Sequence, residues 1–172
     1  MPAPMVDDDQ PPPIALGGPG GSRSEPGWAS DSHPVIMLDD RQSDAVDVDG
    51  LITLARSTLL AEGIVDAELS ISFVTQDEIA ELHERYLHEA GPTDVLSFPL
   101  DDEAGDDGLR QLGDVVIAPA VAARNHPDDP AAELRLLLVH GILHLLGHDH
   151  EDDGDRAEMW VRQERYSGVR VR

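Results

Sequence analysis

The sequence contains no cysteine and no lysine. Without cysteine the chain cannot form a disulfide bond, a thiolate metal site or an iron–sulfur cluster, and it has no cysteine nucleophile. All twelve basic residues are arginine, against 35 acidic residues, which gives a formal net charge of −23. This balance excludes a protein that binds nucleic acid through overall positive charge, and it excludes a polybasic membrane anchor.

Aromatic residues and long apolar runs are also scarce. Phe, Trp and Tyr make up 3% of the chain, so a core has to be built from Leu, Val, Ile and Ala. The most apolar stretch, residues 134–147, contains Arg135, His140 and His144 and is too short to span a bilayer. The N-terminus has neither the basic nor the apolar region of a signal peptide. We therefore expect a cytoplasmic protein without membrane association.

Proline marks a boundary near the N-terminus. Eight of the thirteen prolines lie in residues 1–34, and such a segment buries too little apolar surface to fold. We predict that residues 1–33 are a disordered Pro/Gly-rich tail and that residues 34–172 form a single small domain. The tail holds five acids and one arginine, so 30 acids and 11 arginines, a net charge of −19, belong to the domain.

Hydrophobic periodicity alternates between strand and helix beyond this boundary. It predicts strands at 35–38, 68–73, 95–98 and 114–118, helices through 51–59, 76–87, 130–146 and 152–166, and an exposed acidic loop at 101–113. The third helix is apolar on most sides, so we expect it to be buried. Strands interspersed with helices indicate an α/β or α+β layered domain, and the pattern alone does not fix the strand order.

Four of the eight histidines lie within residues 140–150. His140 and His144 are four residues apart, so they share one face of the predicted buried helix and both reach a single ion. Gly147 follows where a helix that ends on a left-handed residue requires glycine, and that turn directs His150 toward the pair. Three imidazoles leave one tetrahedral position open, which is the arrangement of a catalytic zinc site.

The alternative interpretation is a buried helix whose histidines form hydrogen bonds within the core. Each polar group left unsatisfied there would cost about 1–3 kcal/mol, and one shared metal satisfies both imidazoles at once. We interpret His148 as a surface residue or as a partner of a ligand, rather than as a ligand.

Two other motifs resemble metal sites but lack a required residue. The spacing H-x-x-x-H-x-x-G-x-x-H is that of the metzincin zinc peptidases, in which a glutamate general base follows the first histidine. Here Gly141 follows the first histidine, so this chain has the ligand spacing of a metzincin peptidase but lacks its general base. The acids at 149–154 resemble the start of an EF-hand loop, but Trp160 stands where that loop needs a bidentate glutamate.

Four blocks of the sequence resemble the YbeY endoribonucleases, the bacterial rRNA maturation factors. They are HGILHLLGHDH at 140–150, GPTDVLSFP at 91–99, LGDVVI at 112–117, and Glu158-Met159-Trp160 with Gln163-Glu164. The resemblance implies a small α+β domain with one zinc ion held by His140, His144 and His150. We expect a mixed four-stranded sheet packed with about five helices, and the zinc site at the end of the buried helix.

The resemblance also implies a function. It is single-strand-specific, zinc-dependent cleavage of RNA in rRNA processing, especially maturation of the 3′ end of the small-subunit 16S rRNA, and in ribosome quality control. The expected partners are single-stranded RNA, rRNA, and the ribosome or its small-subunit proteins, without DNA. No catalytic side chain is assigned: zinc-bound water is expected, and attack by that water or by the RNA 2′-OH stays open. Asp114 and Asp149 are candidate proton acceptors or partners of a ligand histidine, with strand-edge or helix-capping roles as the alternative.

One position departs from the family pattern. Many members carry an arginine directly after the tyrosine that precedes the Pro-Thr block, whereas Leu87 follows Tyr86 here. Arg85, one residue earlier, points elsewhere on a helix. We therefore expect that another arginine, for instance Arg124 or Arg135, faces the phosphate, or that the metal carries more of the chemistry.

The acidic charge favours a competing function. An acidic domain repels RNA at long range, because phosphate affinity normally comes from Lys and Arg, although screening over about 8 Å lets a local arginine patch overcome this repulsion. The same surface suits basic ribosomal proteins, which favours a non-catalytic, metal-stabilised adaptor in ribosome assembly. A zinc peptidase is the third interpretation, weakened by the glycine after the first histidine.

Overall fold

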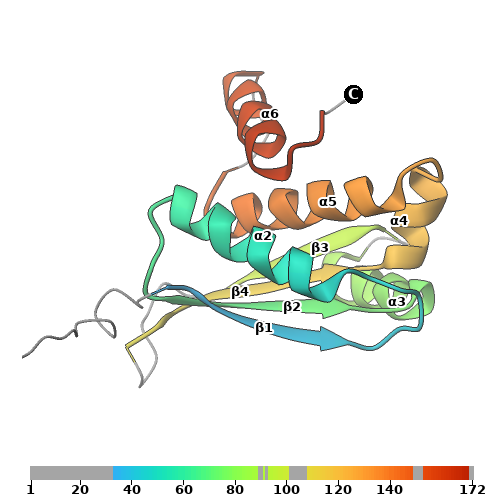
Figure 1. The fold of residues 1–172 in the computed structure, drawn as a ribbon. Coiled ribbons are helices and arrows are strands. Elements are labelled where there is room, and N and C mark those ends of the chain that lie inside the picture. The colour runs from blue at the N-terminus through green and yellow to red at the C-terminus, as the bar shows by residue number, and fades with distance from the viewer. Residues whose placement is uncertain (1–32, 89–90, 92, 101–107, 149–152, 171–172) are drawn as a thin grey trace, which may run out of the picture. The chain divides into compact units, whose positions relative to one another are not determined.

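The computed structural model describes residues 33–88, 91, 93–100, 108–148 and 153–170. The strands are β1 (Val35–Asp40), β2 (Ala67–Phe73), β3 (Val95–Pro99) and β4 (Arg110–Ile117), and the helices are α2 (Val48–Ala61), α3 (Gln76–Leu87), α4 (Pro119–Asn125), α5 (Pro130–Leu145) and α6 (Asp153–Ser167) (Figure 1). From His33 onward the described residues belong to one compact unit. The predicted tail, apart from His33, lies outside the described residues.

The four strands form one mixed sheet in the order β1-β2-β4-β3. β1 pairs parallel to β2 and β2 pairs parallel to β4, whereas β3 runs antiparallel to β4. Parallel neighbours need a crossover connection, and α2 supplies it between β1 and β2. The predicted α+β domain with a mixed four-stranded sheet and about five helices is therefore confirmed.

The predicted loop at 101–113 is wrong in its last residues, because β4 begins at Arg110. The pairing between β2 and β4 skips Leu112, and the next residue, Gly113, has a φ of +132°. This bulge places Leu112 and Val115, three residues apart, in the same core cluster. The two-residue alternation that predicts strands is therefore interrupted inside β4.

The sheet separates two apolar clusters. On one face, Phe73 of β2 packs in a cluster with α2 and with Leu138 of α5. On the other face, Leu96 of β3 and Val116 of β4 pack with Ile79 of α3. Figure 1 shows α2 and α5 side by side over the sheet and α6 on the far side of α5. Helix α5 thus lies between the sheet and α6, which confirms its predicted burial.

Two further findings concern the helices. Helix α4 was not predicted from periodicity, because its seven residues make only two turns. In the part of the chain that the structure describes, no helix is long and apolar enough to cross a membrane.

Candidate metal centre

His140 and His144 lie one helical turn apart on α5 and face each other. Their Nε2 atoms are 3.0 Å apart, and their rings meet edge to face with centroids 4.5 Å apart. Both side chains are half-buried. The four-residue spacing places them on one helix face, and α5 itself is packed on two sides, so rigid secondary structure sets the geometry of the pair.

Helix α6 supplies a partner for His140. Gln163 is only 3% exposed, and its Oε1 forms a hydrogen bond with Nδ1 of His140. An amide oxygen only accepts, so Nδ1 donates the hydrogen. A neutral imidazole that carries its hydrogen on Nδ1 has its lone pair on Nε2, the atom that faces His144.

The pair fits a divalent metal such as zinc. Zn–N bonds of about 2.0–2.1 Å in a tetrahedral site place two ligand nitrogens about 3.3 Å apart, close to the 3.0 Å between the two Nε2 atoms. His150, the third predicted ligand, lies outside the described residues. Among the residues that are described, no three His, Cys, Asp or Glu side chains gather as a metal site requires. The structure brings together two predicted ligands, and the third stays a prediction.

The chain leaves α5 through a tight turn. Gly147 has a φ of +97°, which is the left-handed conformation predicted for it. The backbone N–H of Gly147 donates to the carbonyl of His144 at 3.1 Å, and that of His148 donates to the carbonyl of Leu143 at 3.0 Å. These two bonds fix the direction of the chain two residues before position 150.

His148 contacts a buried carboxylate at the end of α2. Its Nε2 lies 2.9 Å from Oε1 of Glu62, whose side chain is 8% exposed. Glu62 also accepts hydrogen bonds from Arg162 and Tyr166 of α6. We call these four residues the carboxylate cluster. His148 is therefore half-buried, and its partner is Glu62 rather than a ligand histidine.

Burial and hydrogen bonding oppose each other in the carboxylate cluster. Burial raises the pKa of Glu62, but hydrogen bonds from Tyr166 and His148 and the charge of Arg162 outweigh it, so that the pKa lies below its ordinary value. Burial and the hydrogen bond to the carboxylate raise the pKa of Tyr166. The cluster thus holds an ionised glutamate that connects the ends of α2 and α5 to α6.

A family model described as "Endoribonuclease YbeY" matches residues 38–168, which include strands β2 to β4, α5 and the carboxylate cluster. The chain belongs to the YbeY endoribonuclease family. The endoribonuclease YbeY of Frankia alni is 43% identical over 140 residues, which cover 71% of this chain and 75% of that protein. The endoribonuclease YbeY of Acidothermus cellulolyticus is 48% identical over 133 residues, which cover 69% of this chain and 81% of that protein.

A solved structure has the same fold. The solution structure of TM1509 from Thermotoga maritima superposes with a TM-score of 0.52 and 29% sequence identity, covering 77% of this chain and 87% of that one. Together with the family match, it confirms the YbeY resemblance of the four sequence blocks.

The arginines proposed to replace the YbeY arginine are held by other parts of the molecule. Arg124 forms a hydrogen bond at 2.5 Å with the first residue of α3, and Arg135 donates at 3.4 Å to the carbonyl of the last residue of α6. Leu87, which stands at the family arginine's position, is 49% exposed at the end of α3. Arg162 of the carboxylate cluster, next to the turn after α5, was not singled out in the sequence.

Asp114 does not lie beside the histidine pair. It lines a cavity of about 380 Å³ together with Val116, and Val116 belongs to the cluster on the α3 face of the sheet. Alternate residues of a strand share a face, so Asp114 is on the face opposite α5. The observed partner of His140 is Gln163. Asp149, the other candidate, lies outside the described residues.

Gly141 packs directly on the sheet. A Cβ at this position would lie 2.7 Å from Cγ1 of Val115 and 3.2 Å from Oγ of Ser97. The hydroxyl of Ser97 also donates to the carbonyl of Gly141 at 3.1 Å. A side chain here would enter the contact between α5 and the sheet, so packing as well as sequence excludes the metzincin glutamate from this YbeY-family helix.

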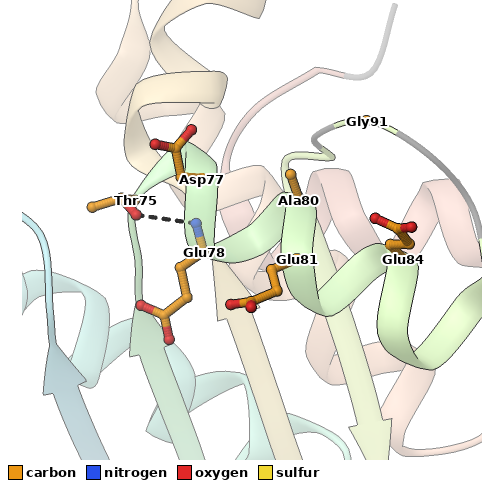
Figure 2. Close-up of a pocket in the computed structure, with 7 residues that line it drawn as sticks. All are labelled: Thr75, Asp77, Glu78, Ala80, Glu81, Glu84 and Gly91. Atoms are coloured by element: carbon orange, nitrogen blue, oxygen red, sulfur yellow. Dashed lines mark hydrogen bonds between the residues drawn. The ribbon is translucent and has the colours of Figure 1, made fainter.

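An acidic hollow lies over α3. Figure 2 shows that the carboxylates of Asp77, Glu78, Glu81 and Glu84 line it along the helix. Thr75 begins the helix: its hydroxyl oxygen accepts a hydrogen bond from the backbone N–H of Glu78 at 3.1 Å. Part of the domain's negative charge is thus concentrated on one helix, away from the histidine pair.

Gln163 and Glu62 are functional-site residues that the sequence patterns did not predict. Gln163 follows Met159 by four residues on the buried side of α6. A polar residue at a position where the helix pattern expects an apolar one was the only sequence feature that could have pointed to it. Glu62 follows the C-terminus of α2, where negative charge is unfavourable. Their histidine partners are 23 and 86 residues away in sequence, so the pairing itself was beyond any local pattern.

Proposed function

We propose that this chain is an endoribonuclease that cleaves single-stranded RNA, ribosomal RNA in particular, at a zinc ion held by His140, His144 and His150. Family membership supports endoribonuclease activity and an RNA substrate. The observation that supports the metal assignment is the pair of Nε2 atoms 3.0 Å apart on the buried helix. Zinc is the proposed metal because three imidazoles with one open position are typical of catalytic zinc.

The side chains at and around the histidine pair suit RNA cleavage at a metal ion. His140 and His144 offer nitrogen ligands, and Gln163 holds a proton on Nδ1 of His140. When bound, zinc supplies positive charge that polarises a phosphoryl oxygen and acidifies water. Position 141 offers no carboxylate base, and general acid–base assistance is worth about 10²–10⁴-fold. RNA carries its own nucleophile in the 2′-OH, so the site suits RNA cleavage better than peptide hydrolysis.

The proposal extends to a partner and a compartment. We assign the protein to the cytoplasm, to maturation of the 16S rRNA 3′ end and to ribosome quality control, with small-subunit ribosomal proteins as docking partners. The acidic hollow over α3 supports a basic protein partner, because complementary charge steers association. The same hollow favours the second candidate function, a non-catalytic ribosome-assembly adaptor.

The deciding experiment compares zinc-loaded and metal-stripped protein on labelled substrates. We expect zinc-dependent cleavage of single-stranded RNA, little cleavage of the same RNA as a duplex, and none of single-stranded DNA of the same sequence or of a peptide library. Cleavage that survives metal removal would contradict the metal centre, and peptide hydrolysis would restore the peptidase interpretation.

A complementation experiment separates the nuclease from the adaptor. Cells that lack the protein are expected to accumulate small-subunit rRNA precursors with unprocessed 3′ ends. A variant with alanine at all three predicted ligands is expected to leave those ends unprocessed. Normal 3′ ends with that variant, at wild-type protein levels, would favour the adaptor.

A further inference from the structure

Helix α6 exposes most of its surface, and its buried residues are Met159, Gln163 and Ser167. They follow one another at four-residue intervals and form a single stripe, and Met159 packs on α5. Gln163 occupies the middle of this stripe and is 3% exposed. Burying an amide is unfavourable unless it is hydrogen-bonded, and the ring of His140 supplies the bond.

This hydrogen bond determines which ring nitrogen of His140 carries the proton. Oε1 of Gln163 has no hydrogen to give, so Nδ1 of His140 must donate one. The lone pair of the neutral ring is then at Nε2, the atom 3.0 Å from Nε2 of His144. In the opposite tautomer Nε2 of His140 would carry the hydrogen, so it could neither accept from Nε2 of His144 nor bind a metal.

We propose that Gln163 is a positioning residue, which holds a proton at Nδ1 of His140 and thereby directs the lone pair of Nε2 into the metal centre. The inference rests on the proposed function, since the metal centre is part of it. A carboxylate partner would add negative charge next to the metal, whereas an amide adds none. At a site that receives polyanionic RNA, a neutral partner leaves the positive charge of the metal undiminished.

The last turn of α6 keeps the amide in place. The hydroxyl of Ser167 donates to the backbone carbonyl of Gln163, and Nε of Arg135 on α5 donates to the carbonyl of Ser167 at 3.4 Å. Tyr166, in the same turn, donates to Glu62. The position of Gln163 is therefore fixed relative to both α5 and α2.

Two substitutions test the inference in the full-length chain. Gln163→Leu keeps the approximate size and removes the acceptor, whereas Gln163→Glu keeps the acceptor and adds a charge. Long-range ¹H–¹⁵N NMR of the metal-stripped protein is expected to show hydrogen on Nδ1 of His140 in the wild type and in Gln163→Glu, and to show its loss in Gln163→Leu. Zn²⁺ affinity, measured by competition with a chelating indicator, is expected to fall by about 10–100-fold in Gln163→Leu only.

Thermal stability separates positioning from packing. If Gln163 only filled space, Gln163→Leu would have both a higher Tm and a higher Zn²⁺ affinity than Gln163→Glu, because leucine buries no charge. We expect the two measurements to rank the variants in opposite order: Gln163→Leu melts above Gln163→Glu yet binds Zn²⁺ weakly, and Gln163→Glu melts lower yet keeps its affinity. Met159→Ala, one turn earlier on the same stripe, is the matched control, which is expected to lower Tm and leave the His140 tautomer unchanged.

Either of two results would overturn the inference: hydrogen on Nε2 of His140 in the wild type, or wild-type Zn²⁺ affinity in Gln163→Leu. A third result concerns the proposed function. A wild-type protein that holds the proton on Nδ1, but binds Zn²⁺ no better than His144→Ala does, would overturn the metal centre and with it the metal-directing part of the inference.

Discussion

On the side of α5 that faces the sheet, Gly141 has no side chain, and the helix backbone comes into contact with Val115 and Ser97. On the side that faces α6, His140 and His144 project half-buried imidazoles, and Nδ1 of His140 forms a hydrogen bond with Gln163. Residues 140 and 141 are adjacent in sequence, but the rotation of about 100° per helical residue points them in different directions. One helix thus provides a packing surface on one side and the proposed metal centre on the other, with no residue shared between the two.

The largest expected effect lies on the α6-facing side. His144→Ala removes one of the two proposed ligands on the rigid helix, so we expect Zn²⁺ affinity to fall by more than about 100-fold, beyond the usual effect of losing a ligand's hydrogen-bond partner. RNA cleavage should fall to background with it. Zinc content per chain and cleavage of labelled RNA check this. Full zinc occupancy with normal cleavage would show that His144 is not a ligand.

Substitutions on the sheet-facing side of α5 should change the free energy of unfolding. Gly141→Glu forces a side chain against Val115 and buries a carboxylate, so we expect a loss of about 3 kcal/mol or more in the free energy of unfolding and no gain of peptide hydrolysis. Gly141→Ala should lose about 1 kcal/mol, because overpacking exceeds the gain in helix propensity. Gly154→Ala, at an exposed position of α6, is the control and should not destabilise. Denaturant unfolding measures all three, and a stable, soluble Gly141→Glu protein would contradict the close contact.

The carboxylate cluster connects the ends of α2 and α5 to α6. Glu62→Ala removes the acceptor of Tyr166 and His148 and one of the two carboxylate partners of Arg162, which keeps its bond to Glu158. We expect a loss of about 2–3 kcal/mol, below the usual 3–5 for breaking a buried pair, because the Arg162 side chain is 32% exposed. The exposed pair of Glu81 and Arg85 on α3 provides the control, and its removal should change stability by at most about 0.5 kcal/mol. Equal losses in the two variants would mean that burial adds nothing to the cluster.

Acid should weaken the same cluster. Because the pKa of Glu62 is lower in the folded protein than its ordinary value of 4.5, its stabilisation is fully present above about pH 4.5 and is lost as the pH falls through the folded value. The difference in unfolding free energy between wild type and Glu62→Gln should therefore shrink from pH 5 toward about pH 3. Urea unfolding across that range measures it, and a difference that grows in acid would reverse the assigned sign.

Local sequence patterns predicted the histidine pair on α5, but they did not predict the contacts that α2 and α6 make with it. The spacing of His140 and His144 is a property of a single helix turn, so sequence alone placed them together, and the left-handed Gly147 followed from the same local rule. The bulge next to Gly113 interrupted the alternation that marks β4. Gln163 and Glu62 meet histidines far away in sequence, and only the packing of α6 and α2 on α5 brings those side chains into contact.

The smallest expected effect concerns a single hydroxyl beneath α5. Ser97 of β3 donates to the carbonyl of Gly141 at 3.1 Å in a half-buried position, so Ser97→Ala should lower the free energy of unfolding by about 1 kcal/mol. Ser57 of α2 makes a matched bond to the carbonyl of Leu54 at 3.0 Å in an exposed position, where water replaces the lost partner, so Ser57→Ala should have almost no effect. Neither substitution touches the α6-facing side, and Zn²⁺ affinity should stay at the wild-type value in both. A Ser97→Ala protein with wild-type stability and weakened Zn²⁺ binding would show that the two sides of the helix are coupled after all.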